Sequence, residues 1–407
     1  GGGHWKQSVT TGRYRKETIY DALWRPVLTR EWDTQSSGSD RYTVRAFDAA
    51  GRETFASYPT GGVTTVSASV QSNQGVSKTY DALGRLRSSA AYSEPEHGLL
   101  TTLVDYESDY VKRVRNPRGQ VTRIEYMQFE PGSEALPTRI DVRDSMTSTT
   151  PLVTIDIGRD TWGKPLSITR SGSNPAVSAT RGYVYDSQQR LCKLIEPEYG
   201  AEIYQLDDAG RIVARAKSPT LTGFNACNVA NVPASAWINH GYDPRGRLLS
   251  TDYPDNTADE SRTYYPNGAL WTVKRGSGAE EVRWTYEYNS RGQVTEERIL
   301  IDVDQSAANT YGYDSLGNLR SLRFLNGPWV YYAPNAFGQP TEATLTIPTE
   351  PTRQIHQLAS NVSYYPNGAM SGFTYGNGVW HYMTPNERGL PKRSVDQIGN
   401  VKWVHNT

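Results

Sequence analysis

A short motif recurs along the chain, and this repetition constrains the fold more than any other feature of the sequence. It reads Y-D-A-L-G-R-L at residues 80–86, Y-D-S-Q-Q-R-L at 185–191 and Y-D-P-R-G-R-L at 242–248. Looser copies bring the array to about 14 units with a mean spacing of roughly 28 residues, which is a period typical of repeat proteins. Most of the chain is therefore expected to be a single array of similar units.

The motif has the residue pattern of a β-hairpin with a type I turn and a glycine bulge. In the third copy Pro244 suits the first turn position because its φ is fixed, and Gly246 suits a position of positive φ. Asp243 and Arg247 are then expected to face each other across the ladder. The flanking cross-strand pair on the opposite face is Tyr242 and Leu248.

The copies support this register because acidic and basic residues occur together. Seven copies carry Lys or Arg after the turn, and each has Asp at the partner position. The pairs are Asp21 with Arg25, Asp48 with Arg52, Asp81 with Arg85, Asp160 with Lys164, Asp186 with Arg190, Asp207 with Arg211, and Asp243 with Arg247. Where Asn replaces Asp, Gln follows the turn at 120, 293 and 339, whereas Asn386 is followed by Leu390. We interpret these residues as structural pairs and not as a row of catalytic or metal-binding carboxylates.

The composition predicts an all-β fold. The 407 residues include 36 Gly, 23 Pro and 27 Tyr, which favours many short strands joined by tight turns. Lys+Arg and Asp+Glu both number 43, so the basic field typical of nucleic-acid binders is absent. No apolar run is long enough for a membrane helix. The sequence has no motif for a cofactor, a metal site or a common hydrolase, so neither a cofactor nor enzymatic activity is expected.

The repeat divides the chain into three parts. Residues 1–18 form an N-terminal lead-in or tag-derived segment, 19–391 form the β-ribbon, and 392–407 form a C-terminal end expected to continue into further sequence. Two stretches near 123–156 and 214–240 lack the motif and are interpreted as insertions. Gly61 and Gly62 predict a loop, followed by a strand up to Val70. Cys192 and Cys227 are expected either to form a disulfide that tethers the second insertion or to remain two free thiols.

The tandem copies, from about residue 20 to residue 391, resemble the Rhs or YD-repeat family of bacterial polymorphic toxins, insecticidal toxin complexes and, more distantly, teneurins. The resemblance implies a long β-ribbon that curves or spirals into part of a hollow shell. Shells of this family cleave themselves at a D-P-x-G-x-x-G-G motif. Here Asp243, Pro244 and Gly246 belong to an ordinary repeat without the following glycine pair. No self-cleavage residues can be assigned.

The resemblance also implies a function. The chain is expected to be an encapsulating shell segment of a secreted bacterial toxin system, located outside the cell or at its surface. Its expected partners are a C-terminal toxin cargo, other shell segments of the same parent protein and a delivery-machine component. The alternative is an adhesion module that binds a glycan or a receptor. Tyr side chains buried between hairpins would favour the shell, whereas exposed stacked aromatics would favour adhesion.

Overall fold

The computed structural model describes residues 5–61, 74–128, 134–255, 257–302, 305–347 and 355–406. The strand predicted up to Val70 and residues 129–133 of the first predicted insertion lie outside this description. The described residues contain 32 β-strands and three short 3₁₀ turns, and the strands belong to one antiparallel sheet. The predicted all-β ribbon of hairpins is confirmed. None of the described helical segments is long and apolar enough to cross a membrane.

The chain divides into two compact units. Unit 1 comprises Gly1–Leu103 and Ala308–Thr407, and unit 2 comprises Val104–Ala307. The early strands are β1 (Trp5–Thr11), β2 (Tyr14–Tyr20), β3 (Pro26–Asp33), β4 (Arg41–Phe47), β5 (Glu53–Ser57), β6 (Gly75–Tyr80), β7 (Leu86–Tyr92) and β8 (Leu99–Ser108). The late strands are β24 (Gln305–Tyr313), β25 (Leu319–Arg323), β26 (Trp329–Pro334), β27 (Pro340–Thr346), β28 (Ile355–Tyr364), β29 (Met370–Tyr375), β30 (Trp380–Pro385), β31 (Pro391–Ile398) and β32 (Val401–Asn406).

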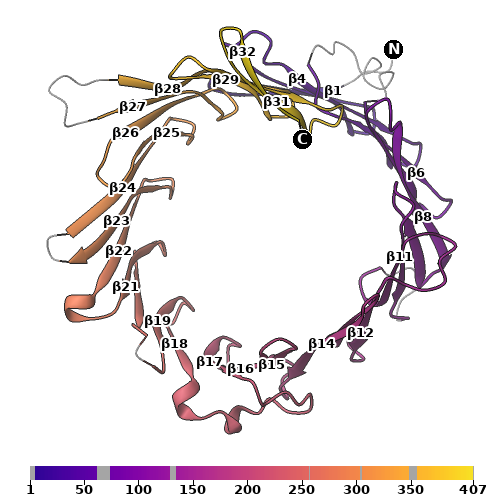
Figure 1. Ribbon diagram of the computed structural model, residues 1–407, viewed down its shortest axis with the longest axis vertical. Helices are drawn as coiled ribbons and strands as arrows, with labels where there is room; N and C mark the ends of the chain where they lie inside the picture. The colour runs from indigo at the N-terminus through magenta and orange to yellow at the C-terminus, as the bar shows by residue number, and fades with distance from the viewer. Residues whose placement is uncertain are drawn as a thin grey trace. The chain divides into compact units, whose positions relative to one another are not determined.

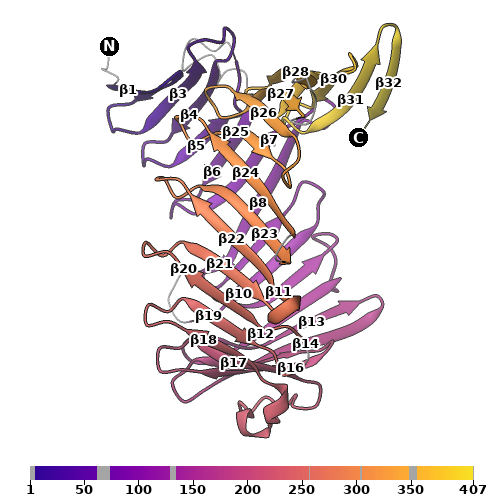
Figure 2. The same cartoon turned by 90° about the vertical axis from the view of Figure 1, so that its left-hand side faces the viewer.

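Unit 2 holds the middle of the ribbon, where strands consecutive in sequence lie side by side (Figure 1). Its strands are β9 (Val111–Arg115), β10 (Val121–Tyr126), β11 (Pro137–Arg143), β12 (Val153–Arg159), β13 (Pro165–Ser173), β14 (Ala176–Tyr185), β15 (Leu191–Glu196), β16 (Gly200–Leu206), β17 (Ile212–Ser218), β18 (Ile238–Tyr242), β19 (Leu248–Asp252), β20 (Glu260–Tyr264), β21 (Leu270–Arg275), β22 (Val282–Tyr288) and β23 (Val294–Asp302). Figure 2 shows the succession from β18 to β23.

The two predicted insertions have different structures. Within 123–156, strands β10, β11 and β12 pair in the same sheet, so the described part of this stretch continues the ribbon without the motif. Residues 219–237 leave the sheet between β17 and β18 and contain the 3₁₀ turns η1 (Val229–Asn231) and η2 (Ala234–Ala236). This second stretch packs on the sheet of unit 2 and supplies part of a buried apolar cluster.

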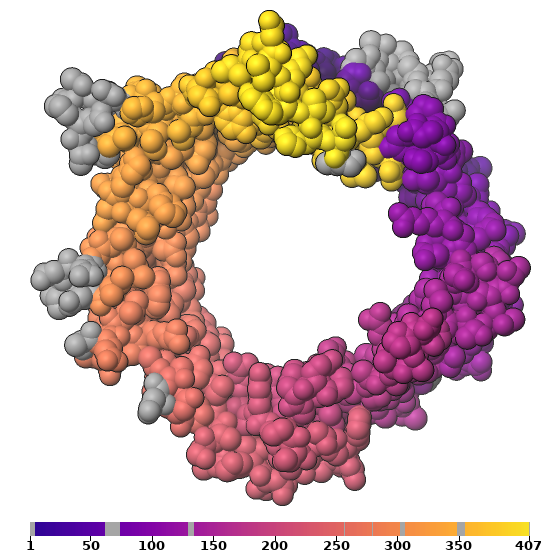
Figure 3. Space-filling view, in the orientation of Figure 1, coloured from indigo at the N-terminus to yellow at the C-terminus, as the bar shows by residue number. Residues whose placement is uncertain are grey.

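Unit 1 brings the first and last parts of the chain together. Arg13 donates to the carbonyl of Pro334 at 2.7 Å, and the buried carboxylate of Asp33 accepts from the backbone N–H of Ala336 at 2.9 Å. Figure 3 shows purple atoms of the early part of the chain beside yellow atoms of its late part. These contacts bridge more than 300 residues of sequence, which no local pattern reveals.

Candidate functional site: the hairpin turns and the insertion

The repeated turns hold the predicted pairs, and the Asp of each pair has two roles. In the third copy, Asp243 N–H donates to Arg247 O at 3.0 Å, and Gly246 adopts φ 80°. Asp243 Oδ1 accepts from the N–H groups of Arg245 and Arg247, both at 2.9 Å, while Oδ2 accepts from Arg247 Nε at 2.6 Å. One carboxylate therefore caps the turn backbone and also pairs with the guanidinium.

The structure places all seven predicted charged pairs in contact. Their N···O distances lie between 2.6 and 3.2 Å, and the side chains are partly exposed to solvent. The backbone N–H of Arg247, helped by its guanidinium, holds the pKa of the Asp243 carboxyl below its usual range. Exposed ion pairs contribute little individually. The pairs therefore serve mainly to fix the turn geometry and the strand register.

The copies in which Asn and Gln replace the charged pair, called the amide copies here, keep the same geometry without charge. Asn116 Nδ2 donates to Gln120 Oε1 at 3.0 Å, and the two further pairs have distances of 3.1 and 3.0 Å. At the exceptional copy, Asn386 Oδ1 still accepts from the N–H groups of Arg388 and Leu390. The backbone cap is thus present even where the side-chain pair is missing.

Contacts between successive hairpins give the cation and the tyrosine of the motif a second role. Arg211 Nη1 donates to the carbonyl of Asp243 in the next turn at 3.3 Å, and its guanidinium lies 5.1 Å from the ring centroid of Tyr242. The Tyr242 hydroxyl donates back to Ile212 O at 2.9 Å. The Arg52–Tyr80 pair repeats the ring contact, at 4.9 Å. Hairpins that make these contacts are therefore bonded to the next hairpin through the motif itself.

Two shortened copies of the motif read Y-Y-P-N-G-A, at residues 264–269 and 364–369. In these copies Tyr265 and Tyr365 occupy the position of the Asp, and their hydroxyls donate to the following strands at Tyr286 O and Met383 O. A further turn of the same backbone type joins Tyr375 to Val379. The Asn-Gly dipeptide within that turn was the available signal.

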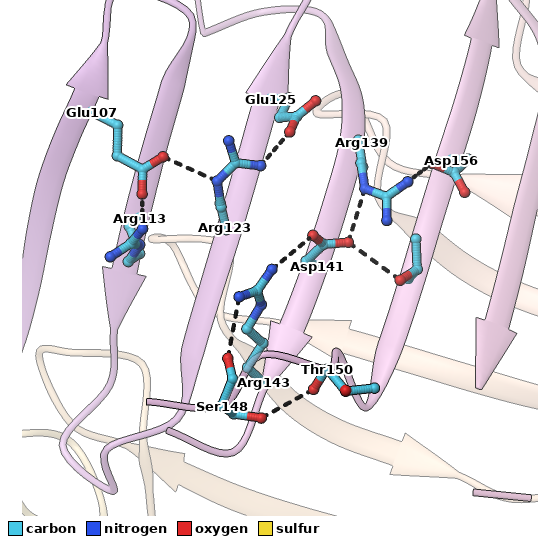
Figure 4. A network of polar contacts seen from close by, with 11 residues as sticks. Glu107, Arg113, Arg123, Glu125, Arg139, Asp141, Arg143, Ser148, Thr150 and Asp156 are labelled. Carbon is cyan, nitrogen blue, oxygen red and sulfur yellow. Dashed lines mark hydrogen bonds and ion pairs between the residues drawn. The ribbon is translucent and has the colours of Figure 1, made fainter. Parts of the chain in front are cut away.

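A charged network crosses β8 to β12, in the part of the ribbon that contains the first predicted insertion (Figure 4). Its centre is Asp141, which is 3% exposed and accepts from Arg139 Nε at 3.0 Å and from Thr154 Oγ1 at 3.2 Å. Glu107 pairs with Arg113 and Arg123 at one end. Several of its ion pairs join side chains on different strands, so they tie the strands together. Within the described residues, no cluster of His, Cys, Asp and Glu is suited to a metal ion.

A cavity of about 380 Å³ lies in unit 1 and is lined by polar residues of its early and late strands. Arg13 Nη1 donates to Gln35 Oε1 at 3.1 Å, and Gln339 Nε2 donates to Gly368 O at 3.2 Å. Asp40 pairs with Arg30. Because these groups are bonded to other parts of the chain, we interpret the cavity as a gap between the early and late strands of unit 1 and not as a ligand site.

The insertion is covalently attached to the sheet. Cys192 on β15 and Cys227 form a disulfide whose Cα atoms are 5.4 Å apart. The adjacent residue, Lys193, is fully buried, and its Nζ donates to Asn228 Oδ1 at 2.6 Å. The disulfide is one of the two alternatives predicted from the sequence, whereas Lys193 lies in no motif that would have pointed to it.

The architecture defines a class of protein, the tandem β-hairpin repeat, in which the same turn geometry recurs along the ribbon. Comparison with solved structures gives the fold more specifically. A Tc holotoxin pore of Photorhabdus luminescens matches 97% of this chain with a TM-score of 0.71 at 12% identity. A TcdB2–TccC3 complex matches 96% with a TM-score of 0.62 at 13% identity. The chain has the fold of these toxin-complex proteins, as the YD-repeat resemblance implied.

The chain spans about one fifth of each of these larger chains, 21% in both comparisons. No family model matches the sequence, and no curated protein matches it. At 12 to 13% identity the structural likeness establishes the fold alone.

The amide copies suggest a direct test of the turn chemistry. Asp243→Asn should lower the melting temperature because it leaves the Arg247 guanidinium without its carboxylate. Adding Arg247→Gln should recover part of the loss, because Asn keeps the backbone cap and the new pair matches Asn289 and Gln293. Differential scanning calorimetry measures the melting temperatures of the wild type, the single variant and the double variant. A double variant that melts no higher than the single one would contradict this account.

Proposed function

We propose that this chain is a structural wall segment of a secreted YD-repeat toxin system and helps to enclose a toxic polypeptide. The observation that carries the proposal is the use of the motif's polar groups within the ribbon. Tyr242 and Tyr264 donate their hydroxyls to the preceding hairpin, at Ile212 O and Leu248 O. Tyr side chains held between hairpins suit a continuous wall, and the likeness to toxin-complex proteins over nearly the whole chain supports the same role.

Containment places few demands on individual residues. A wall needs many weak contacts and no anchored ligand, in contrast to a binding site with convergent polar groups. The zero formal net charge and the repeated surface of the ribbon fit such a role. The proposed partners are a toxic polypeptide and further wall segments, and the proposed location is outside a bacterial cell. We assign no enzymatic activity to the chain.

The test is limited proteolysis of the natural polypeptide that contains this sequence, compared with a version from which these residues are deleted. We expect its toxic segment to resist protease in the first and to be degraded in the second. Isolated residues 1–407, mixed with the same segment, should protect it poorly, because a wall acts by enclosure. Equal degradation with and without the chain would contradict containment.

Adhesion is the second candidate because a row of rings crosses the last four strands. Phe373, His381, Asp396 and Trp403 are successive cross-strand partners from β29 to β32, and Trp403 is 49% exposed. An exposed ring that continues a row of rings and lies beside a carboxylate suits the face and hydroxyls of a sugar. One-to-one glycan binding that Trp403→Ala abolishes, and Trp271→Ala in unit 2 does not, would favour adhesion over containment.

A further inference from the structure

Residues 219–237 cover one face of β14 to β17 in unit 2. Near β18, Val232 and Trp237 are buried together with Ile203 and Ala201 of the sheet. The middle of the insertion differs, because residues 223–226 are exposed and only the two that follow are half-buried. We call residues 223–228 the latch segment. Its apolar contacts come from Phe224, whose ring lies against Gly182 of β14, and from Cys227, so other interactions must help to hold it against the sheet.

One of these interactions is the disulfide. Cys192 is 3% exposed on β15, and its partner Cys227 lies in the latch segment, 35 residues further along the chain. The strand register shifts between Val184 and Tyr185, as at the other repeat turns. A bulge at this point allows two consecutive residues of β15 to face the same side of the sheet. Cys192 and Lys193 both reach the latch segment as a result.

The other interaction involves a buried charge. Lys193 is 0% exposed, and its Nζ donates to Asn228 Oδ1 at 2.6 Å and to Gly223 O. Among the described residues, no carboxylate forms an ion pair with it. Burying an ammonium group against neutral oxygens is costly, because those oxygens replace only part of its hydration. The same burial lowers the pKa of Lys193.

These two features oppose each other. Opening the latch segment would return the Lys193 ammonium to water, whereas the disulfide prevents that opening. Val232 and Trp237 anchor the rest of the insertion, so the movement can stay local to residues 223–228. We propose that the Cys192–Cys227 disulfide is a thiol-sensitive latch that keeps Lys193 and the adjoining sheet face covered until it is reduced.

The chemistry requires a dithiol reductant. One thiolate attacks a sulfur of the disulfide, the S–S bond breaks, and the displaced cysteine leaves as a thiolate that takes up a proton. The second thiol of the reductant then resolves the mixed disulfide and is itself oxidised to a disulfide. The products are two cysteine thiols in the chain and one oxidised dithiol, so atoms and electrons balance.

Amine acylation of the intact chain tests the latch. With the disulfide intact, acetic anhydride should modify Lys193 slowly and the exposed Lys402 rapidly, as read by peptide mass spectrometry. Reduction with dithiothreitol should raise the Lys193 rate about tenfold or more, since local opening controls access. The Cys192→Ser/Cys227→Ser variant should show the same rate without reductant. The proposal would be overturned if Lys193 is acylated as slowly as before in the reduced protein, with its two thiols verified by mass, and in the double Ser variant.

Two measurements separate a latch from general unfolding. Backbone amides of β14 to β17 should keep their slow hydrogen exchange after reduction, whereas fast exchange throughout these strands would overturn a local latch. Lys193→Met removes the buried charge but keeps a long side chain. In the reduced Lys193→Met protein, Cys192 should react with iodoacetamide more slowly than in the reduced wild type. Equal or faster alkylation would show that the buried charge does not drive opening.

Discussion

Replacing Ile203 by alanine is expected to lower the free energy of unfolding of unit 2 by about 2–5 kcal/mol, the usual cost of truncating a large buried aliphatic side chain. Ile203 is 0% exposed and lies in the apolar cluster between the sheet and the insertion. The loss should be large because a thin ribbon has few such clusters and little neighbouring mass that could fill the cavity. Urea denaturation followed by tryptophan fluorescence measures it, since Trp237 lies in the same cluster.

Leu194 provides the matched control. It lies on β15, the strand next to β16 that carries Ile203. Leu194 pairs with Glu202 while Ile203 pairs with Lys193, so the two side chains point to opposite faces. Leu194 is only half-buried, and Leu194→Ala should therefore cost clearly less. Equal losses for the two variants would show that the insertion adds no stability to the face it covers.

Replacing Gly376 by alanine is expected to destabilise unit 1 by about 3 kcal/mol, at the upper end of typical overpacking costs. A Cβ at this position would lie 1.7 Å from the carbonyl oxygen of Gln357 and 2.8 Å from its carbon. Both atoms are backbone, so relief requires β28 to move away from the turn after β29. The Gly376 N–H bond to Leu358 O, now 2.9 Å, would be strained or lost.

Gly378 in the same turn distinguishes steric overlap from backbone conformation. It has φ +85°, and no atom lies within 4 Å of the position of its missing Cβ. Gly378→Ala should cost about 1 kcal/mol, from the left-handed backbone alone. Thermal unfolding followed by circular dichroism compares the two variants. A Gly376→Ala protein as stable as the Gly378→Ala protein would mean that β28 and the turn are not as close as described.

The local structure of the ribbon follows from short-range pattern. Asp243, Gly246 and Arg247 lie within five residues, so the turn, its bulge and the facing pair can be predicted from neighbouring positions. The all-β fold followed from the composition and from the repeated hairpin motif. The turn at Tyr375 was missed because it carries neither the Asp nor the cation of the motif and has Gly376 where the shortened copies have Pro. Its backbone bonds are nevertheless of the same type.

The sequence by itself determined the repeat period, the hairpin register and the fold class, because each depends on residues close together in the chain. Only the tertiary structure decided which distant parts of the chain contact one another within each unit. The bond from Arg211 to the Asp243 carbonyl, the contact of Asp33 with Ala336 and the cover over Lys193 link residues 32, 303 and 35 positions apart. Such contacts depend on how the chain folds back on itself, and a spacing pattern within one repeat carries no information about that path.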